Sequence, residues 1–221
     1  MSKLTIRTIP ILALLLLAGA KQASAQGFSA YFGVGSASDG AATTSGCPPR
    51  QVLDNFETVP TCEGAPVIGG VFGVFGADFM ITPHLGVNGE YSFRFAQAPY
   101  LPDVGLNARP QFYDFNAIYQ PTSGTSRVVP VLEGGIGGSK LSLYATQSGC
   151  STGFCINPSQ AVATSNHFQI HGAIGVKLYV KSDIFIKPQV DLHWVPNLNQ
   201  QYSSAFVPQY TISVGYTFGR H

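Results

Sequence analysis

Charged side chains are scarce in this chain. Asp, Glu, Lys and Arg make up 10% of its 221 residues, whereas soluble globular domains carry about 25%. Because a surface in contact with water is mostly polar, so little charge leaves few residues for a fully hydrated exterior. Hydrophobic residues reach 45% and aromatic residues 12%, which is ample for an exterior that faces lipid.

Long apolar runs are also missing, apart from one near the start. Residues 9–18 are apolar, follow two basic residues and precede Ala-Ser-Ala at 23–25. This order is typical of a cleavable secretory signal peptide, and the run is short of the roughly 20 residues that a spanning helix needs. We therefore expect residues 1–25 to be a signal peptide, residues 26–221 to form one domain, and any membrane span to consist of strands.

Strong net charge is absent as well. Removing residues 1–25 takes away three of the 12 basic residues and none of the 11 acidic ones, which leaves a net charge of −2 with histidine neutral. A balance this close to zero gives no reason to expect a nucleic-acid partner or an acidic one.

What the chain does have is alternation, clearest in residues 168–194. Apolar and polar residues alternate up to Val180. The alternation is interrupted at Ser182-Asp183 and resumes from Ile184. Side chains on a strand alternate between its faces, so the pattern predicts an antiparallel hairpin with one apolar and one polar face. The residues expected to face lipid are Phe168, Ile174, Leu178, Ile186, Leu192 and Trp194.

The same alternation recurs along the chain, with short and long connections in turn. The long connections include residues 38–67 and 146–166. Short periplasmic turns and longer outer loops are typical of outer-membrane barrels, so we expect an all-β, up-and-down transmembrane barrel with both termini in the periplasm. A soluble lipocalin-like barrel would turn its apolar face inward and is disfavoured by the lack of charge. The eight predicted strands are residues 28–36, 69–80, 85–95, 109–119, 127–144, 168–180, 184–194 and 207–219.

One predicted strand changes parity along its length. Leu132 and Ile136 share one face, but after Gly137-Gly138 the apolar residues Leu141 and Leu143 take the other. A β-bulge inserts one extra residue and would produce this slip. The sequence therefore predicts a bulge at the two glycines.

The end of the chain carries the most specific motif, Val-Gly-Tyr-Thr-Phe-Gly at 214–219. With its eight alternating segments, the chain resembles small eight-stranded outer-membrane barrels of the OmpA and OmpX kind, within the broad group of bacterial outer-membrane β-barrel domains. The resemblance implies that Tyr216 and Phe218 form the terminal signal read by the barrel assembly machinery. It also implies a monomer in contact with outer-membrane lipid and lipopolysaccharide.

Four cysteines lie in two near pairs within the predicted outer loops. Cys47 is close to Cys62, and Cys150 is close to Cys155. Export favours disulfides, and of the three possible connectivities local pairing is the most economical. A metal site at Cys150-x4-Cys155 with His167 lacks the second tight ligand pair that tetrahedral zinc sites use. We expect disulfides and no metal site.

Charged residues also fall on the face expected to point into the barrel. An eight-stranded barrel is only wide enough for its own side chains, and an unpaired buried charge is costly. We therefore predict a mixed-charge network that closes the lumen, with Glu133 placed to meet Lys177. The predicted members are Glu90, Arg94, Glu133, Lys177, Lys187 and Asp191.

These polar residues allow two other interpretations. Exchange of partners in such a network would open a narrow solute channel. His171 or His193 with Asp191 and a serine would form an acyl-transfer set, but no serine has a diagnostic context and the His-x-Ser signature of a lipid A deacylase is absent. We therefore expect no catalytic residues and no cofactor. The predicted function is non-enzymatic, in envelope integrity or surface interaction through the outer loops, whose ligand the sequence does not identify.

Overall fold

The structure is a computed structural model. The predicted signal peptide lies outside the residues it describes. Those residues are 27–39, 49–51, 58–60, 68–101, 106–122, 126–146, 149–151, 154–156, 159–196, 198 and 204–219. Among them, no helix has the length and apolar character needed to span a membrane.

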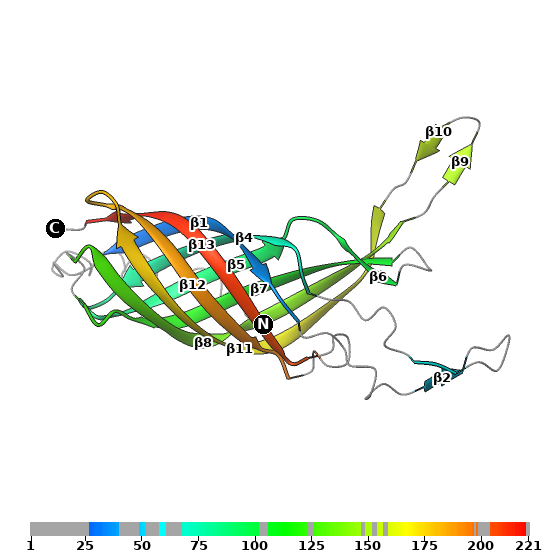
Figure 1. Cartoon of the computed structure of the whole chain (residues 1–221), viewed down its shortest axis with the longest axis horizontal. Helices are drawn as coiled ribbons and strands as arrows, with labels where there is room; N and C mark the ends of the chain where they lie inside the picture. Colours follow the sequence, from blue (N-terminus) through cyan, green and yellow to red (C-terminus); the bar gives the residue numbers. More distant parts are fainter. Residues whose placement is uncertain are drawn as a thin grey trace, which may run out of the picture.

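In the described part of the chain, eight antiparallel strands close into a barrel (Figure 1). Each wall strand pairs with the next wall strand along the chain, and the first pairs with the last, from Phe28↔Phe218 to Ala37↔Gln209. This up-and-down order matches the predicted architecture. The wall strands are β1 (Phe28–Ala37), β4 (Val71–Met80), β5 (Leu85–Arg94), β7 (Leu106–Tyr119), β8 (Val128–Thr146), β11 (Ser159–Tyr179), β12 (Ile184–Trp194) and β13 (Phe206–Phe218).

The longer connections gather at one end of the barrel (Figure 1). They contain the short strands β2 (Pro49–Gln51), β3 (Thr58–Pro60), β6 (Ala98–Leu101), β9 (Gly149–Ser151) and β10 (Phe154–Ile156).

The expected loop at residues 146–166 is shorter than predicted. Strand β11 begins at Ser159, which pairs with Thr146, so β8 and β11 continue well beyond the point where β12 joins β11 at Ile170. Residues 159–164 are exposed on both faces. Without a buried face they show no two-residue period, which is the pattern that predicts a half-buried strand.

The predicted bulge at Gly137-Gly138 is wrong. Strand β8 keeps continuous register past both glycines, with Tyr113↔Gly138 on one side and Gln169↔Gly137 on the other. The parity of the apolar residues changes because the lumen itself becomes apolar towards this end, where Leu141 is buried. The register shift in this pairing lies instead between Ala161 and Ala163 of β11.

The outside of the barrel is apolar. All six residues predicted to face lipid lie on the outward parity of β11 and β12, with Ile174 66% exposed. Exposed aromatic residues border the short connections at Phe28, Phe79 and Phe218, and border the long ones at Trp194 and Phe206. Transmembrane barrels carry such aromatic girdles on either side of an apolar band. The wall strands have at least 10 residues, enough for a tilted strand to cross a bilayer.

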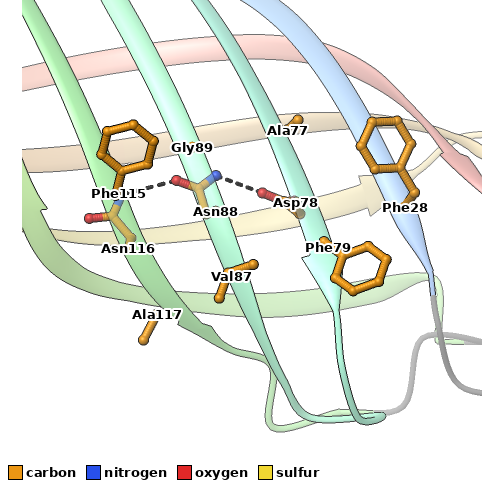
Figure 2. A pocket seen from close by; sticks show the side chains of 10 residues that line it. All are labelled: Phe28, Ala77, Asp78, Phe79, Val87, Asn88, Gly89, Phe115, Asn116 and Ala117. Atoms are coloured by element: carbon orange, nitrogen blue, oxygen red, sulfur yellow. Dashed lines mark hydrogen bonds between the residues drawn. The ribbon is translucent and has the colours of Figure 1, made fainter. Parts of the chain in front are cut away.

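A shallow hollow interrupts this apolar exterior (Figure 2). The outward residues Ala77, Gly89 and Ala117 are small, and the larger Phe28 and Phe115 stand beside them. The inward residues Asp78, Asn88 and Asn116 lie directly behind, joined by hydrogen bonds of 2.7 Å and 2.9 Å. The wall is thin here because Gly89 has no side chain.

The lumen is layered along the barrel axis. Nearest the short connections, Met80, Ile118 and Val131 form a small apolar cluster. The middle contains the buried polar and charged side chains. A larger apolar cluster lies towards the long connections: Ala37, Ile68, Phe72, Ala108, Phe112, Leu141, Val195, Leu198 and Val207.

Candidate functional site

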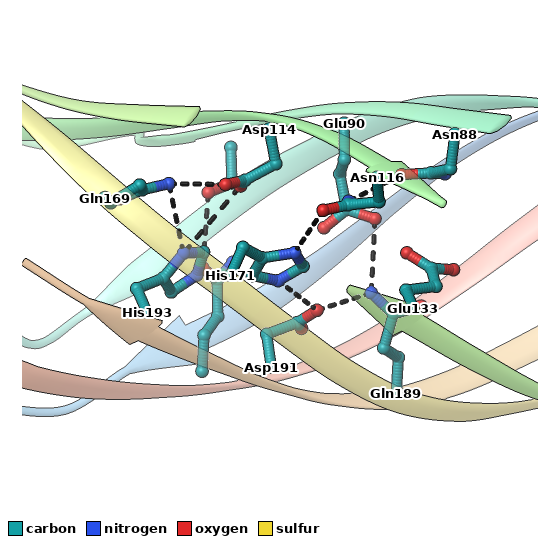
Figure 3. Close-up of polar contacts among 12 residues, drawn as sticks. Asn88, Glu90, Asp114, Asn116, Glu133, Gln169, His171, Gln189, Asp191 and His193 are labelled. Carbon is teal, nitrogen blue, oxygen red and sulfur yellow. Dashed lines mark hydrogen bonds and ion pairs between the residues drawn. The ribbon is translucent and has the colours of Figure 1, made fainter. Parts of the chain in front are cut away.

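The buried polar layer in the middle of the lumen is the candidate site (Figure 3). At its centre is Lys187 of β12, which is 1% exposed. Its Nζ lies 2.7 Å from Glu133 Oε1 and donates to the Tyr31 hydroxyl at 3.1 Å. Tyr31 in turn donates to Glu90 Oε2 at 2.7 Å, and Gln189 Nε2 donates to the same oxygen at 3.2 Å. One lysine thus links carboxylates from β8 and β5 across the lumen.

Tyr31 reaches this position because its neighbours on both sides are glycines. Gly76 and Gly215 are its register partners on β4 and β13. A Cβ at Gly76 would lie 2.2 Å from Tyr31 Cζ, and one at Gly215 would lie 2.7 Å from Tyr31 Cβ. Glycine at both positions makes room for the ring, over which Lys187 Nζ stands 4.2 Å from the centroid.

A second ion pair lies nearer the short connections. Lys177 Nζ of β11 is 2.7 Å from Asp78 Oδ2 of β4, with both side chains buried. Asn88 donates to Asp78 Oδ1 at 2.7 Å and to the Tyr31 hydroxyl at 2.8 Å, which joins this pair to the Lys187 group. Because a buried charge is stable only when paired and hydrogen-bonded, the two lysines hold the barrel strands in a defined arrangement.

Two histidines occupy the side of the layer nearest the long connections. His171 and His193 stack with their ring centroids 4.8 Å apart. His171 Nδ1 lies 2.9 Å from Asn116 Oδ1, and its Nε2 lies 3.3 Å from Asp191 Oδ1. His193 Nδ1 is 3.7 Å from Asp114 Oδ2.

The apolar cluster begins directly beyond these histidines. Phe112 stacks on His193 at a centroid distance of 4.5 Å and an interplanar angle of 15°. Phe112 also stacks on Phe72, with 6.1 Å between the ring centroids. Both phenylalanines are 0% exposed. The polar layer is therefore covered on this side by aromatic rings from β4 and β7, the two strands that flank β5.

The chain was compared with known proteins at three levels. No protein-family model matches it, and no curated protein matches it. Solved structures do match. The outer membrane protein OprG from Pseudomonas aeruginosa superimposes with a TM-score of 0.53 at 12% identity, covering 88% of this chain and 96% of that one. Neisserial surface protein A gives 0.51 at 12% identity, covering 89% and 98%. This chain has the fold of a small outer-membrane β-barrel. At this level of identity the likeness shows the fold alone. The roles of individual residues are therefore inferred from the geometry of this chain.

The barrel brings most of the predicted network residues into one layer. Glu133, Lys187 and Glu90 meet through Tyr31, and Asp191 joins through Gln189, whose Nε2 is 2.5 Å from Asp191 Oδ1. The expected contact between Glu133 and Lys177 is wrong, because Lys177 pairs with Asp78 and Glu133 pairs with Lys187. A strand's parity gives the side of the wall, but the partner across the lumen depends on strand stagger, which the sequence pattern does not encode.

Arg94 lies in a different layer of the barrel from its predicted partners. It ends β5 at the side of the long connections, where a Cβ on Gly70 would lie 2.8 Å from its Nη2. Its backbone carbonyl accepts a hydrogen bond from Arg109 Nε at 2.7 Å. The guanidinium therefore packs against Gly70, whose φ of 93° brings the backbone into a conformation that favours glycine.

The two terminal aromatic residues lie on the outer surface where the barrel closes. Tyr216 and Phe218 are 43% and 52% exposed and contact each other at 4.8 Å between ring centroids. Phe218 also meets Phe28 of β1 at 5.7 Å. Both rings are thus accessible from the membrane side, and their recognition by the assembly machinery stays a prediction.

Of the two predicted disulfides, one joins cysteines that the structure describes. Cys47 and Cys62 lie outside the described residues, whereas Cys150 and Cys155 face each other in the backbone register of the β9–β10 hairpin. We expect non-reducing peptide mapping to find Cys47 linked to Cys62 and Cys150 linked to Cys155. A peptide that joins the first loop to the third would refute local pairing.

Sequence reasoning missed the aromatic part of the lumen. The predictions made from the sequence give no role to Phe72, Phe112 or Tyr31. One signal was available: the inward parity of residues 69–80 contains Phe72 and Val74, which a uniformly polar lumen does not need. An apolar residue at an inward position indicates an apolar layer.

Proposed function

We propose that this protein is a non-enzymatic bacterial outer-membrane barrel with a closed lumen, which serves envelope integrity or surface interaction through the connections at one end. The observation that carries the proposal is the filling of the lumen. Two ion pairs, Lys187–Glu133 and Lys177–Asp78, cross it with all four side chains at most 1% exposed.

The apolar cluster towards the long connections supports the same reading. A solute path needs a continuous polar lining or a pore wide enough for water. Here Phe72, Phe112 and Leu141 belong to one buried apolar cluster, which lies between the polar layer and the long connections. Opening a path past them requires both the displacement of aromatic rings and the separation of buried charges.

The surroundings of the two histidines support a non-enzymatic role. Acyl transfer needs a serine within hydrogen-bond reach of the base and access for the substrate. The described polar contacts of His171 and His193 are to Asn116, Asp191, Gln169, Asp114 and Gln209, and both rings are buried. Ser92 is linked to His193 through Gln209, to whose Oε1 it donates at 3.2 Å.

The placement of the strand ends supports an orientation. β1 begins and β13 ends beside the short connections, opposite the hairpins β2–β3 and β9–β10 (Figure 1). With short turns in the periplasm, both termini are periplasmic and the long connections face the environment. The apolar exterior then contacts lipid and lipopolysaccharide, and the protein acts as a monomer.

Single-channel recording in planar bilayers tests the closed lumen. We expect the refolded protein to insert without conductance steps, because ion pairs and aromatic rings fill the lumen. The matched variant Phe72→Ala with Phe112→Ala removes the two stacked rings but leaves both ion pairs in place, so it should also insert without conductance steps. Regular conductance steps from the parent protein would contradict the proposal and identify a narrow channel instead.

A further inference from the structure

The polar layer contains three potential metal ligands from three strands. Asp114, His171 and His193 come from β7, β11 and β12, and one donor atom from each lies within 4.8 Å of the other two. All three side chains are buried. Tetrahedral zinc holds its nitrogen and oxygen ligands at about 2.0–2.2 Å, which separates them from each other by about 3.3 Å. The observed distance of 3.7 Å between His193 Nδ1 and Asp114 Oδ2 is close to this value.

The ring of His193 is oriented as in a metal-binding histidine. Its Nε2 lies 3.1 Å from Gln209 Oε1, an acceptor, so this nitrogen carries the hydrogen and Nδ1 carries the lone pair. This Nδ1 lies 3.7 Å from Asp114 Oδ2. A histidine that binds metal almost always donates its other N–H to an oxygen that fixes the tautomer. His171 has an oxygen at each nitrogen, from Asn116 and Asp191, so whichever nitrogen binds a metal, the other keeps an oriented partner.

A fourth ligand is available between Asp114 and His193. The Gln169 amide nitrogen lies 2.5 Å from Asp114 Oδ1 and 3.3 Å from His193 Nδ1. Its Oε1 is buried and has no hydrogen-bond partner among the described residues. Rotation of the amide would turn this oxygen towards the position between the two ligands. Gln169 would then join Asp114, His171 and His193 as the fourth ligand.

The charge of the lumen is compatible with an additional cation. The buried side chains of the layer include five carboxylates but only two lysines, Lys177 and Lys187. With all five carboxylates ionised, a deficit remains even if both histidines are protonated. Uncompensated buried charge is strongly unfavourable, and either protonation of a carboxylate or a bound cation removes it. A divalent cation beside Asp114 would supply two positive charges where neither lysine reaches. The five carboxylates are Asp78, Glu90, Asp114, Glu133 and Asp191.

We propose that Asp114, His171 and His193 form a binding site for a divalent transition metal of the zinc class, with Gln169 as the fourth ligand. Two imidazoles with one carboxylate suit zinc and its neighbours, whereas Mg²⁺ and Ca²⁺ prefer sets made of oxygen alone. The site joins β7, β11 and β12 within the lumen. A bound metal would therefore add a cross-link to the wall, and it enters as the barrel folds, because Phe112 covers His193 in the closed state.

Refolding with and without metal tests the site. Tag-free protein is refolded into detergent micelles with Zn²⁺ or with Mg²⁺, passed through a chelating desalting step, and analysed by mass spectrometry for metal. We expect about one zinc per chain, since one set of four ligands holds one ion, and no retained magnesium. We also expect the zinc-loaded barrel to melt at a higher temperature than the protein refolded without metal, because a ligand that binds only the folded state stabilises it.

Variants identify the ligands. Asp114→Asn keeps an oxygen that accepts from Gln169 and is expected to fold, but to retain at least tenfold less zinc. His193→Gln should behave in the same way. His84→Gln is the matched control, because His84 lies in an exposed turn outside the lumen, and it should retain as much zinc as the parent.

Each outcome decides the proposal. If the parent retains no zinc after refolding, or if Asp114→Asn retains as much as the parent, the site does not exist. If circular dichroism shows that a variant does not fold, the parent protein is refolded with Co²⁺ in place of Zn²⁺. Strong visible absorption from tetrahedral cobalt then supports the site, and its absence overturns it. These results are independent of the conductance experiment, because a metal can bind a lumen that is closed or open.

Discussion

Replacing Glu133 with alanine is expected to lower the free energy of unfolding of the barrel by about 3–5 kcal/mol, the usual cost of removing one partner from a buried pair. Glu133 Oε1 is 2.7 Å from Lys187 Nζ, and both side chains are 1% exposed. Alanine leaves the ammonium in the lumen with only the Tyr31 hydroxyl as a described neutral partner. Urea unfolding in lipid vesicles, followed by tryptophan fluorescence, measures the change.

Two controls separate the charge from the loss of side-chain volume. The double variant Glu133→Leu with Lys187→Met removes both charges and keeps the lumen filled. Its free energy of unfolding should be far closer to that of the parent than the value for Glu133→Ala, because well-packed apolar residues replace a buried ion pair at little cost. Lys181→Ala removes an exposed lysine from the turn before β12 and should change stability by less than about 0.5 kcal/mol. Unchanged unfolding of Glu133→Ala would show that the pair contributes nothing to the plug.

Placing arginine at Ile174 is expected to destabilise the barrel in lipid by about 2–4 kcal/mol, the cost of a basic side chain near the bilayer midplane. Ile174 is 66% exposed on the outer surface, and it lies midway along the part of β11 that pairs with β12, opposite Val190. Its side chain would therefore contact hydrocarbon on every exposed side. The same unfolding measurement in vesicles gives the difference from the parent.

The matched control lies on the same strand. Val162 is 56% exposed, and at about 3.3 Å per residue it lies about 40 Å along β11 from Ile174, beyond the apolar band. Val162→Arg should therefore leave stability nearly unchanged. If Ile174→Arg unfolded like the parent while Val162→Arg did not, the outward face of β11 would not be in contact with lipid.

The faces of the strands could be predicted from the sequence because parity is a local property. Each residue of a strand points to the side opposite its neighbour, so the spacing of Ile174 and Lys177 already assigns one to the exterior and the other to the lumen. The number of wall strands followed in the same way from the recurrence of the pattern. Where a strand has no buried face, as at residues 159–164, this information is missing and the sequence indicated a loop.

Only the tertiary structure decided which lumen residues meet. Lys177 and Lys187 have the same parity and similar neighbours along the chain, yet one pairs with Asp78 and the other with Glu133. Their partners lie on strands that are distant in sequence, and the distance between them depends on the stagger of all the strands in between. The same holds for Asp114, His171 and His193, which come together because three registers align. Local patterning determined the side of the wall on which each residue lies, and closure of the barrel determined its neighbours.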